Sequence, residues 1–109
     1  MSRSGAIIRL TAERWTHVVE AHDYMAGLHE WVLEAVADPD AICEGWDDSL
    51  IALQHRAKTP ITSKDLVVVY CEVASLQGTE HSDGFVITAF MTSKPERIRE
   101  RGILWARKH

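Results

Sequence analysis

The stretch DLVVVYCEVA (residues 65–74) decides the fold. It is apolar almost throughout, as a central strand is when both of its faces are covered. A polar, glycine-bearing loop (75–84) leads from it into GFVITAFMTS (84–93), whose side chains alternate with the period of a strand. On one face of that strand we expect Phe85, Ile87, Ala89 and Met91, and on the other Val86, Thr88, Phe90 and Thr92.

Two further strands are predicted before this pair. AICEGW (41–46) and LIALQHRAK (50–58) have the period of strands, with a turn at 47–49 between them and a loop at 59–64 after them. In the second strand Ile51, Leu53 and His55 face one way, and Gln54 and Arg56 the other. The run 41–93 therefore predicts four strands joined by short loops.

Helical patterns flank these strands. The short β-branched run AIIRL (6–10) precedes Thr11, a plausible N-cap for a helix that begins at Ala12. LHEWVLEAVAD (28–38) predicts a second helix, which ends before Pro39 because the residue preceding a proline resists helical angles. Near the C-terminus PERIRERG (95–102) predicts a short helix, with proline in its first turn and a closing glycine. The predicted fold class is α+β, with two N-terminal helices packed on a four-stranded antiparallel β-sheet and a short C-terminal helix.

Composition indicates an ordinary globular chain. The 109 residues are 46% hydrophobic and 26% charged, which suits one domain over 1–109 with one core. No apolar stretch has the length of a membrane span or of a signal-peptide core, so we expect a cytoplasmic protein without a membrane partner. Cys43 and Cys71 lie in predicted strands and have no CxxC partner, which favours buried free thiols.

Charge is distributed unevenly along the chain. The formal net charge is −4, but residues 94–109 carry +4, so residues 1–93 carry −8. A basic tail of this kind can meet an anionic partner, and it is equally typical of a solvated helix face with glutamate and arginine interleaved.

The stretch HVVEAH (17–22) places two histidines and a glutamate within six residues. On a straight helix His17 and His22 point about 140° apart, so they do not share a face as zinc ligands do. The two side chains could converge only if the helix ended near Ala21 and left His22 on the following loop. The order also differs from the H-E-x-x-H and H-x-x-E-H patterns of zinc proteases.

RWTHVVEAH, the helix ending in ADPD, the strand pair around Gly45, LVVVY and GFVITAFMTSK together resemble a family of nucleases. The resemblance is to the phage- and mobile-element-associated branch of the barnase/EndoU/colicin/RelE-like nucleases, and it covers roughly residues 14–94. It implies a compact, metal-independent endoribonuclease that needs no cofactor, is often a toxin, and is held in check by an antitoxin or immunity protein. Relatives of the RelE type are generally basic over the RNA-binding face, whereas this chain is acidic over residues 1–93.

The resemblance also implies site residues, carried over only where this chain matches. They are His17 and His22 as the acid/base pair, Arg56 and Thr88 as further catalytic residues, and Ser93 and Lys94 as substrate contacts. Apart from the resemblance, Tyr24 lies two residues after His22 and could stack on a base or donate a hydrogen bond to a phosphate, so we add it as a candidate substrate contact. Metal-free RNA cleavage by the 2′-hydroxyl needs such groups, because a proton must be removed, another donated, and the phosphorane charge stabilised. Histidine exchanges protons near neutral pH, and arginine can offer a bidentate fork to phosphate oxygens.

Each of these residues also has a purely structural interpretation. His22 can cap a helix, Thr88 is a good strand former, Arg56 can solubilise an edge strand, and Tyr24 can anchor the join of two helices. We expect His29, His55 and His81 to be solvated or in loops, with His55 the first exception to consider because it adjoins Arg56. Two functions therefore stay open, a toxin-like endoribonuclease and a catalytically inactive member of the same fold that serves as a protein-binding or regulatory module.

Overall fold

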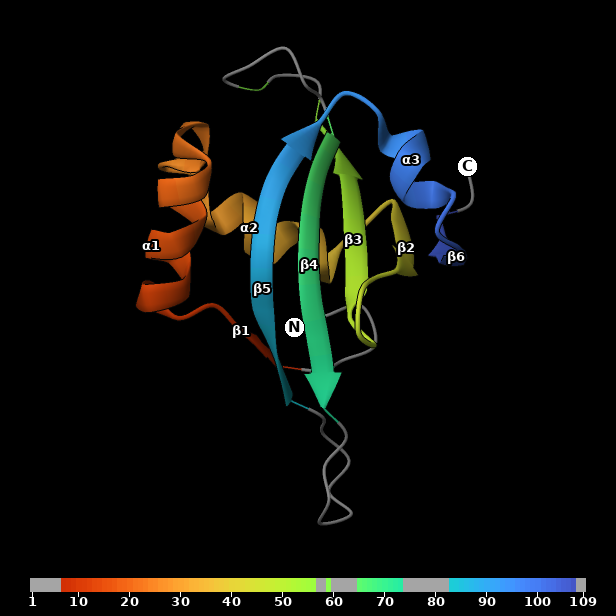
Figure 1. Cartoon of the computed structure of the whole chain (residues 1–109), viewed down its shortest axis with the longest axis horizontal. Coiled ribbons are helices and arrows are strands. Elements are labelled where there is room, and N and C mark those ends of the chain that lie inside the picture. The colour runs from red at the N-terminus through yellow and green to blue at the C-terminus, as the bar shows by residue number, and fades with distance from the viewer. Residues whose placement is uncertain (1–6, 57–58, 60–64, 74–82, 108–109) are drawn as a thin grey trace.

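The computed structural model describes residues 7–56, 59, 65–73 and 83–107 (Figure 1). Its elements are β1 (Ile7–Arg9), α1 (Ala12–Ala21), the 3-10 turn η1 (Asp23–Met25), α2 (His29–Ala37), β2 (Ala41–Glu44), β3 (Leu50–His55), β4 (Asp65–Val73), β5 (Asp83–Thr92), α3 (Pro95–Arg99) and β6 (Ile103–Ala106). Residues 57–58 of the second predicted strand, most of the two predicted loops, and His81 lie outside the described residues.

The predicted four-stranded antiparallel sheet with two N-terminal helices and a short C-terminal helix is wrong in its strand count and in its topology. In the described residues the fold is α+β, but three helices accompany one mixed sheet of six strands in the order β1-β5-β4-β3-β2-β6. The four expected strands form its centre and pair antiparallel. In addition β1 pairs parallel with β5 at one edge, and β6 pairs antiparallel with β2 at the other.

Both missed strands are edge strands, and their lengths explain the error. β1 has three residues and β6 has four, too few for a period of two to be distinct in the sequence. Each becomes a strand because its backbone pairs with a strand that is distant in the sequence, β1 with β5 and β6 with β2.

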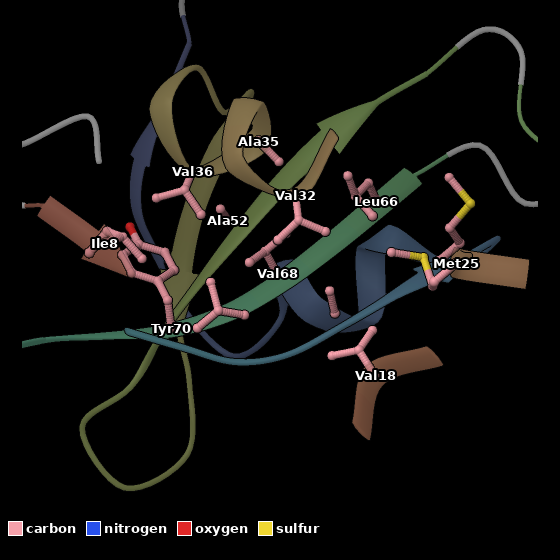
Figure 2. Packing of buried hydrophobic residues seen from close by; sticks show 13 residues of the cluster. Ile8, Val18, Met25, Val32, Ala35, Val36, Ala52, Leu66, Val68 and Tyr70 are labelled. Carbon is pink, nitrogen blue, oxygen red and sulfur yellow. The ribbon is translucent and has the colours of Figure 1, made fainter. Parts of the chain in front are cut away.

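The two faces of the sheet are covered differently. Figure 1 shows α1 beside β5 and α2 behind the sheet, while α3 lies near β2 and β6. The core on the helix side, drawn in Figure 2, contains Val18 and Met25, Val32, Ala35 and Val36, and Ala52, Leu66, Val68 and Tyr70 among others. The opposite cluster contains Ala41, Cys43, Ile51, Leu53, Val67 and Val69, with Ile98 of α3 packed against it. Because β4 supplies buried side chains to both clusters, its prediction as a strand covered on both faces is confirmed.

The expected alternation of β5 holds only in part. A register irregularity between Val69 and Tyr70 pairs Thr88 with Val69 and Val86 with Tyr70, which leaves Ile87 as an extra residue. Val86 therefore joins the helix-side core with Ala89 and Met91, although strict alternation predicted it on the opposite face. A β-bulge shifts the phase of the strand in this way.

Two local predictions are confirmed, the N-cap of α1 and the start of α3. The Thr11 side chain accepts a hydrogen bond from the backbone N–H of Arg14 at 3.1 Å, so it is the N-cap of α1. Pro95 is the first residue of α3. Both cysteines are free thiols, Cys43 fully buried and Cys71 half-buried. In the described residues no helix has the length and apolarity to cross a membrane.

Candidate functional site

The two histidines of HVVEAH lie on different sides of α1. His17 is exposed and approaches Glu13 at 3.9 Å and Glu20 at 3.8 Å, both on the same helix. The helix ends at Ala21, so His22 occupies the C-cap, the one arrangement in which the two side chains could converge. Instead the ring of His22 lies 5.7 Å from that of Phe90, so the pair does not form a single site.

Tyr24 lies beside His22, with 5.7 Å between ring centroids, and its hydroxyl has a structural contact. The backbone N–H of Met91, on β5, donates a hydrogen bond to the Tyr24 hydroxyl oxygen at 3.0 Å. This bond ties the segment between α1 and α2 to the edge of β5. The hydroxyl accepts in this bond and keeps its own proton for donation, so a substrate contact of Tyr24 would use that proton or the face of the ring.

The other predicted residues are spread over the molecule. Thr88 is half-buried on β5, and Ser93 and Lys94 are exposed just after that strand. Arg56 lies at the far end of β3, where its guanidinium donates to Glu34 at 2.7 Å and to Gln54 at 2.9 Å. It also stacks on the ring of Trp31 with 4.3 Å to the centroid. Arg56 therefore holds β3 to α2, and it has carboxylate and amide partners of its own.

A different histidine has the surroundings of an acid/base group. His55 is the last residue of β3 and Asp65 the first of β4, and the strand register places them opposite each other. The imidazole Nδ1 lies 3.4 Å from the Asp65 carboxylate. The backbone N–H of His55 donates to the carboxylate of Asp40 at 2.7 Å, which fixes the end of β3. With Nδ1 directed at Asp65, the ring presents Nε2 to its open side.

His55 also lines a pocket beside α3, which we call the α3 pocket. It has a volume of about 570 Å³ and is lined by Asp40, Leu53, His55, Asp65, Pro95 and Arg99. Arg99 makes no ion pair with any described carboxylate. Burial raises the pKa of the Cys43 thiol on neighbouring β2, and the positive charge of Arg99 opposes that rise. The α3 pocket thus combines a histidine–aspartate pair with a half-buried arginine that lacks a carboxylate partner.

A second pocket of about 510 Å³ shares Asp40 and His55 with the first. Its walls are held by ion pairs. Arg107 binds the carboxylate of Asp38, and its Nε lies 3.5 Å from Asp40, which ties the chain after β6 to the segment before β2. The Arg56 guanidinium closes the far side through Glu34. The cations of this second pocket are already paired, so the α3 pocket has the greater capacity for an anion.

Sequence reasoning missed Asp40, Asp65, Arg99 and Arg107, and singled out His55 only as a neighbour of Arg56. Among the residues predicted for the site, only Arg56 lines either of these pockets. The described residues contain no group of three or more His, Cys, Asp or Glu side chains that could hold a metal ion. The arrangement can remove a proton and bind an anion.

Comparison of the chain with protein-family models, with curated proteins and with solved structures finds no match. The chemistry of the two pockets is therefore the basis for a function.

Proposed function

We propose that the protein is a metal-independent endoribonuclease whose acid/base centre is the His55–Asp65 pair in the α3 pocket. The observation that carries this proposal is the presence, in one pocket, of a histidine beside a carboxylate and an arginine without a carboxylate partner among the described residues. The resemblance to RelE-like and barnase-like nucleases supports the same reaction but favours other residues.

The reaction needs no cofactor. Nε2 of His55 removes the proton from a ribose 2′-hydroxyl, and the 2′-oxygen attacks the adjacent phosphorus. The P–O5′ bond breaks, leaving a 2′,3′-cyclic phosphate and a 5′-oxygen that takes a proton from water. Asp65 orients the imidazole and stabilises the imidazolium, as carboxylates do for catalytic histidines. Arg99 offers its guanidinium to the phosphate oxygens as negative charge develops on them.

The rings of His22 and Phe90 lie at the same end of the sheet as the α3 pocket. Asp65 pairs with Thr92 and Val67 with Phe90, so Phe90 and Asp65 lie on the same face of neighbouring strands. His55 is two strand spacings from β5, about 10 Å. An RNA strand that crosses this end of the sheet would place one base against the rings of His22 and Phe90 and the next phosphate in the α3 pocket. In this arrangement His22 contributes to substrate binding.

Cleavage of total RNA in excess EDTA tests the proposal, with product ends analysed for 2′,3′-cyclic phosphate. His55→Gln is expected to lower the rate at least 100-fold, the usual loss for a general base, and Asp65→Asn and Arg99→Gln to lower it substantially. His17→Gln changes an exposed histidine on α1 and serves as the matched control. If His22→Gln abolishes cleavage while His55→Gln leaves it intact, the acid/base centre lies in HVVEAH and not at His55. Absence of cleavage by folded wild-type protein rejects the proposal that the protein is a nuclease.

The second candidate is the catalytically inactive module of the same fold. Four carboxylates line the two pockets, those of Glu34, Asp38, Asp40 and Asp65, and two of the three arginines there are already paired with them. This acidity favours a protein partner over RNA. If the protein is such a module, we expect no RNA cleavage by the wild-type protein and unchanged binding of the protein partner by His55→Gln.

A further inference from the structure

A second surface with ligand-binding features lies at the opposite end of β3. It is a pocket of about 390 Å³ between the β2–β3 turn and β6, lined by Glu44, Gly45, Asp48, Ser49, Leu50 and Leu104. We call these residues, together with the adjoining Trp46 and Asp47, the acidic corner. β3 advances about 17 Å over its length, so this corner lies well away from the His55–Asp65 pair.

The acidic corner carries uncompensated negative charge. Glu44, Asp47 and Asp48 are all exposed, and none forms an ion pair with another described residue. The nearby cation is Arg101, whose Nε donates to the backbone carbonyl oxygen of Glu44 at 3.0 Å rather than to a carboxylate. The corner is therefore electrostatically complementary to a positively charged ligand.

Ser49 supplies an independent indication of a ligand. Ser49 is only 4% exposed, and its hydroxyl makes no hydrogen bond with any described residue. Buried hydroxyls without a partner are uncommon, because leaving one unsatisfied costs about 1–3 kcal/mol. The oxygen itself is enclosed beside Gly45, but Ser49 lines the pocket, so rotation of its side chain would present the hydroxyl to a donor group that enters there.

The acidic corner and the adjoining start of β6 also carry exposed apolar side chains. Trp46 is 52% exposed, and at the start of β6 Ile103 and Leu104 are 49% and 54% exposed. They are half of the six large hydrophobic side chains exposed in the described residues. The guanidinium of Arg101 lies over the Trp46 ring at 4.1 Å, so this indole already holds a cation. Exposed apolar side chains beside a charged pocket are typical of a protein-binding surface.

We infer that the acidic corner docks a basic segment of a partner protein, which places a lysine or arginine side chain in the pocket and apolar neighbours against Leu104 and Trp46. The negative charge selects the cation, Ser49 accepts a hydrogen bond from it, and the hydrophobic side chains bind the rest of the segment. This inference does not depend on the nuclease. A partner bound here leaves the α3 pocket open, about 17 Å away along β3.

The test uses the full chain, labelled with ¹⁵N, and two synthetic peptides of opposite charge. The basic probe is acetyl-Gly-Lys-Leu-Lys-Val-Lys-Gly-amide, and the acidic control replaces each lysine with glutamate. Amide and indole shifts are followed during titration. The basic peptide is expected to perturb residues 44–50 and 101–104 with an affinity that falls as salt is added, and the acidic peptide is expected not to bind.

Matched variants distinguish binding at the acidic corner from nonspecific attraction of the peptide to the protein's overall negative charge. Glu44→Gln/Asp48→Asn is expected to weaken binding of the basic peptide at least tenfold, and Leu104→Ala to weaken it severalfold. Asp23→Asn/Glu30→Gln removes the same charge from exposed positions on η1 and α2, and it should bind like the wild type. The inference is overturned if the perturbed residues surround Asp38 and Asp40 instead. It also fails if both double variants lose affinity equally, if free lysine amide binds as well as the peptide, or if no peptide binds.

Discussion

Tyr70 on β4 is fully buried in the helix-side core, and its hydroxyl has no hydrogen-bond partner among the described residues. A buried hydroxyl without a partner costs about 1–3 kcal/mol of folding free energy. Tyr70→Phe removes that hydroxyl and keeps the ring. We therefore expect the variant to be more stable than the wild type by about 1 kcal/mol at pH 7, a rise in Tm of about 4–8 °C for a domain of this size.

The pH dependence of the same variant gives a second, independent test. Burial raises the pKa of Tyr70 well above its ordinary value, and the charge of Glu72 raises it further. Below pH 10 the hydroxyl is neutral in both states, so it adds no pH dependence. Above pH 10 the unfolded tyrosine ionises while the folded one keeps its proton, so wild-type stability falls by about 1.4 kcal/mol per pH unit. The advantage of Tyr70→Phe should therefore grow by about 1.4 kcal/mol between pH 9 and pH 11.

Tyr24→Phe is the matched control, because its hydroxyl accepts a hydrogen bond from the backbone N–H of Met91. Its removal leaves that N–H unpaired and should cost about 1 kcal/mol. Urea unfolding followed by circular dichroism at pH 7, 9 and 11 measures all three proteins. The reasoning is refuted if Tyr70→Phe is less stable than the wild type at pH 7, or if the difference between them stays constant from pH 9 to pH 11.

Three further predictions concern packing, the β2–β3 turn and thiol reactivity. Met25 is fully buried between helix and sheet, so Met25→Ala should cost about 2–5 kcal/mol in urea unfolding; a loss below 1 kcal/mol would contradict the packing. Asp48 has a φ of 63°, a conformation that glycine adopts freely, so Asp48→Gly should stabilise the fold by about 1 kcal/mol, measured as a higher Tm. The buried Cys43 has a raised pKa and should react with a thiol reagent far more slowly than half-buried Cys71, as judged by mass spectrometry of peptides; equal rates would place Cys43 at the surface.

HVVEAH shows that residues close together in a sequence motif need not form a single site in the structure. HVVEAH has residues suited to acid/base chemistry, but the helix that contains it directs His17 to glutamates of its own face and His22 to the edge of β5. The His55–Asp65 pair has no local motif, because its two members come from different strands on either side of a loop. The variants proposed above decide between these two positions in one assay.

Local sequence determined the elements whose signals lie within a few residues. Thr11 caps α1 because its side chain reaches an N–H three residues ahead, and Pro95 begins α3 because its fixed φ suits a first helical turn. β4 is apolar almost throughout because both of its faces are covered, so the sequence alone placed it at the centre of the sheet. These features follow from side-chain period and backbone preference.

Tertiary structure decided the rest, because pairing between distant segments depends on register. β1 and β6 are strands only through pairing with segments distant in the sequence, and the bulge at Ile87 moves Val86 to the other face. Asp40, His55 and Asp65 meet because β2 begins, β3 ends and β4 begins at the same end of the sheet. A shift of one residue in any of these strands would turn the side chains to the opposite face, so the composition of the pocket is a property of the assembled sheet.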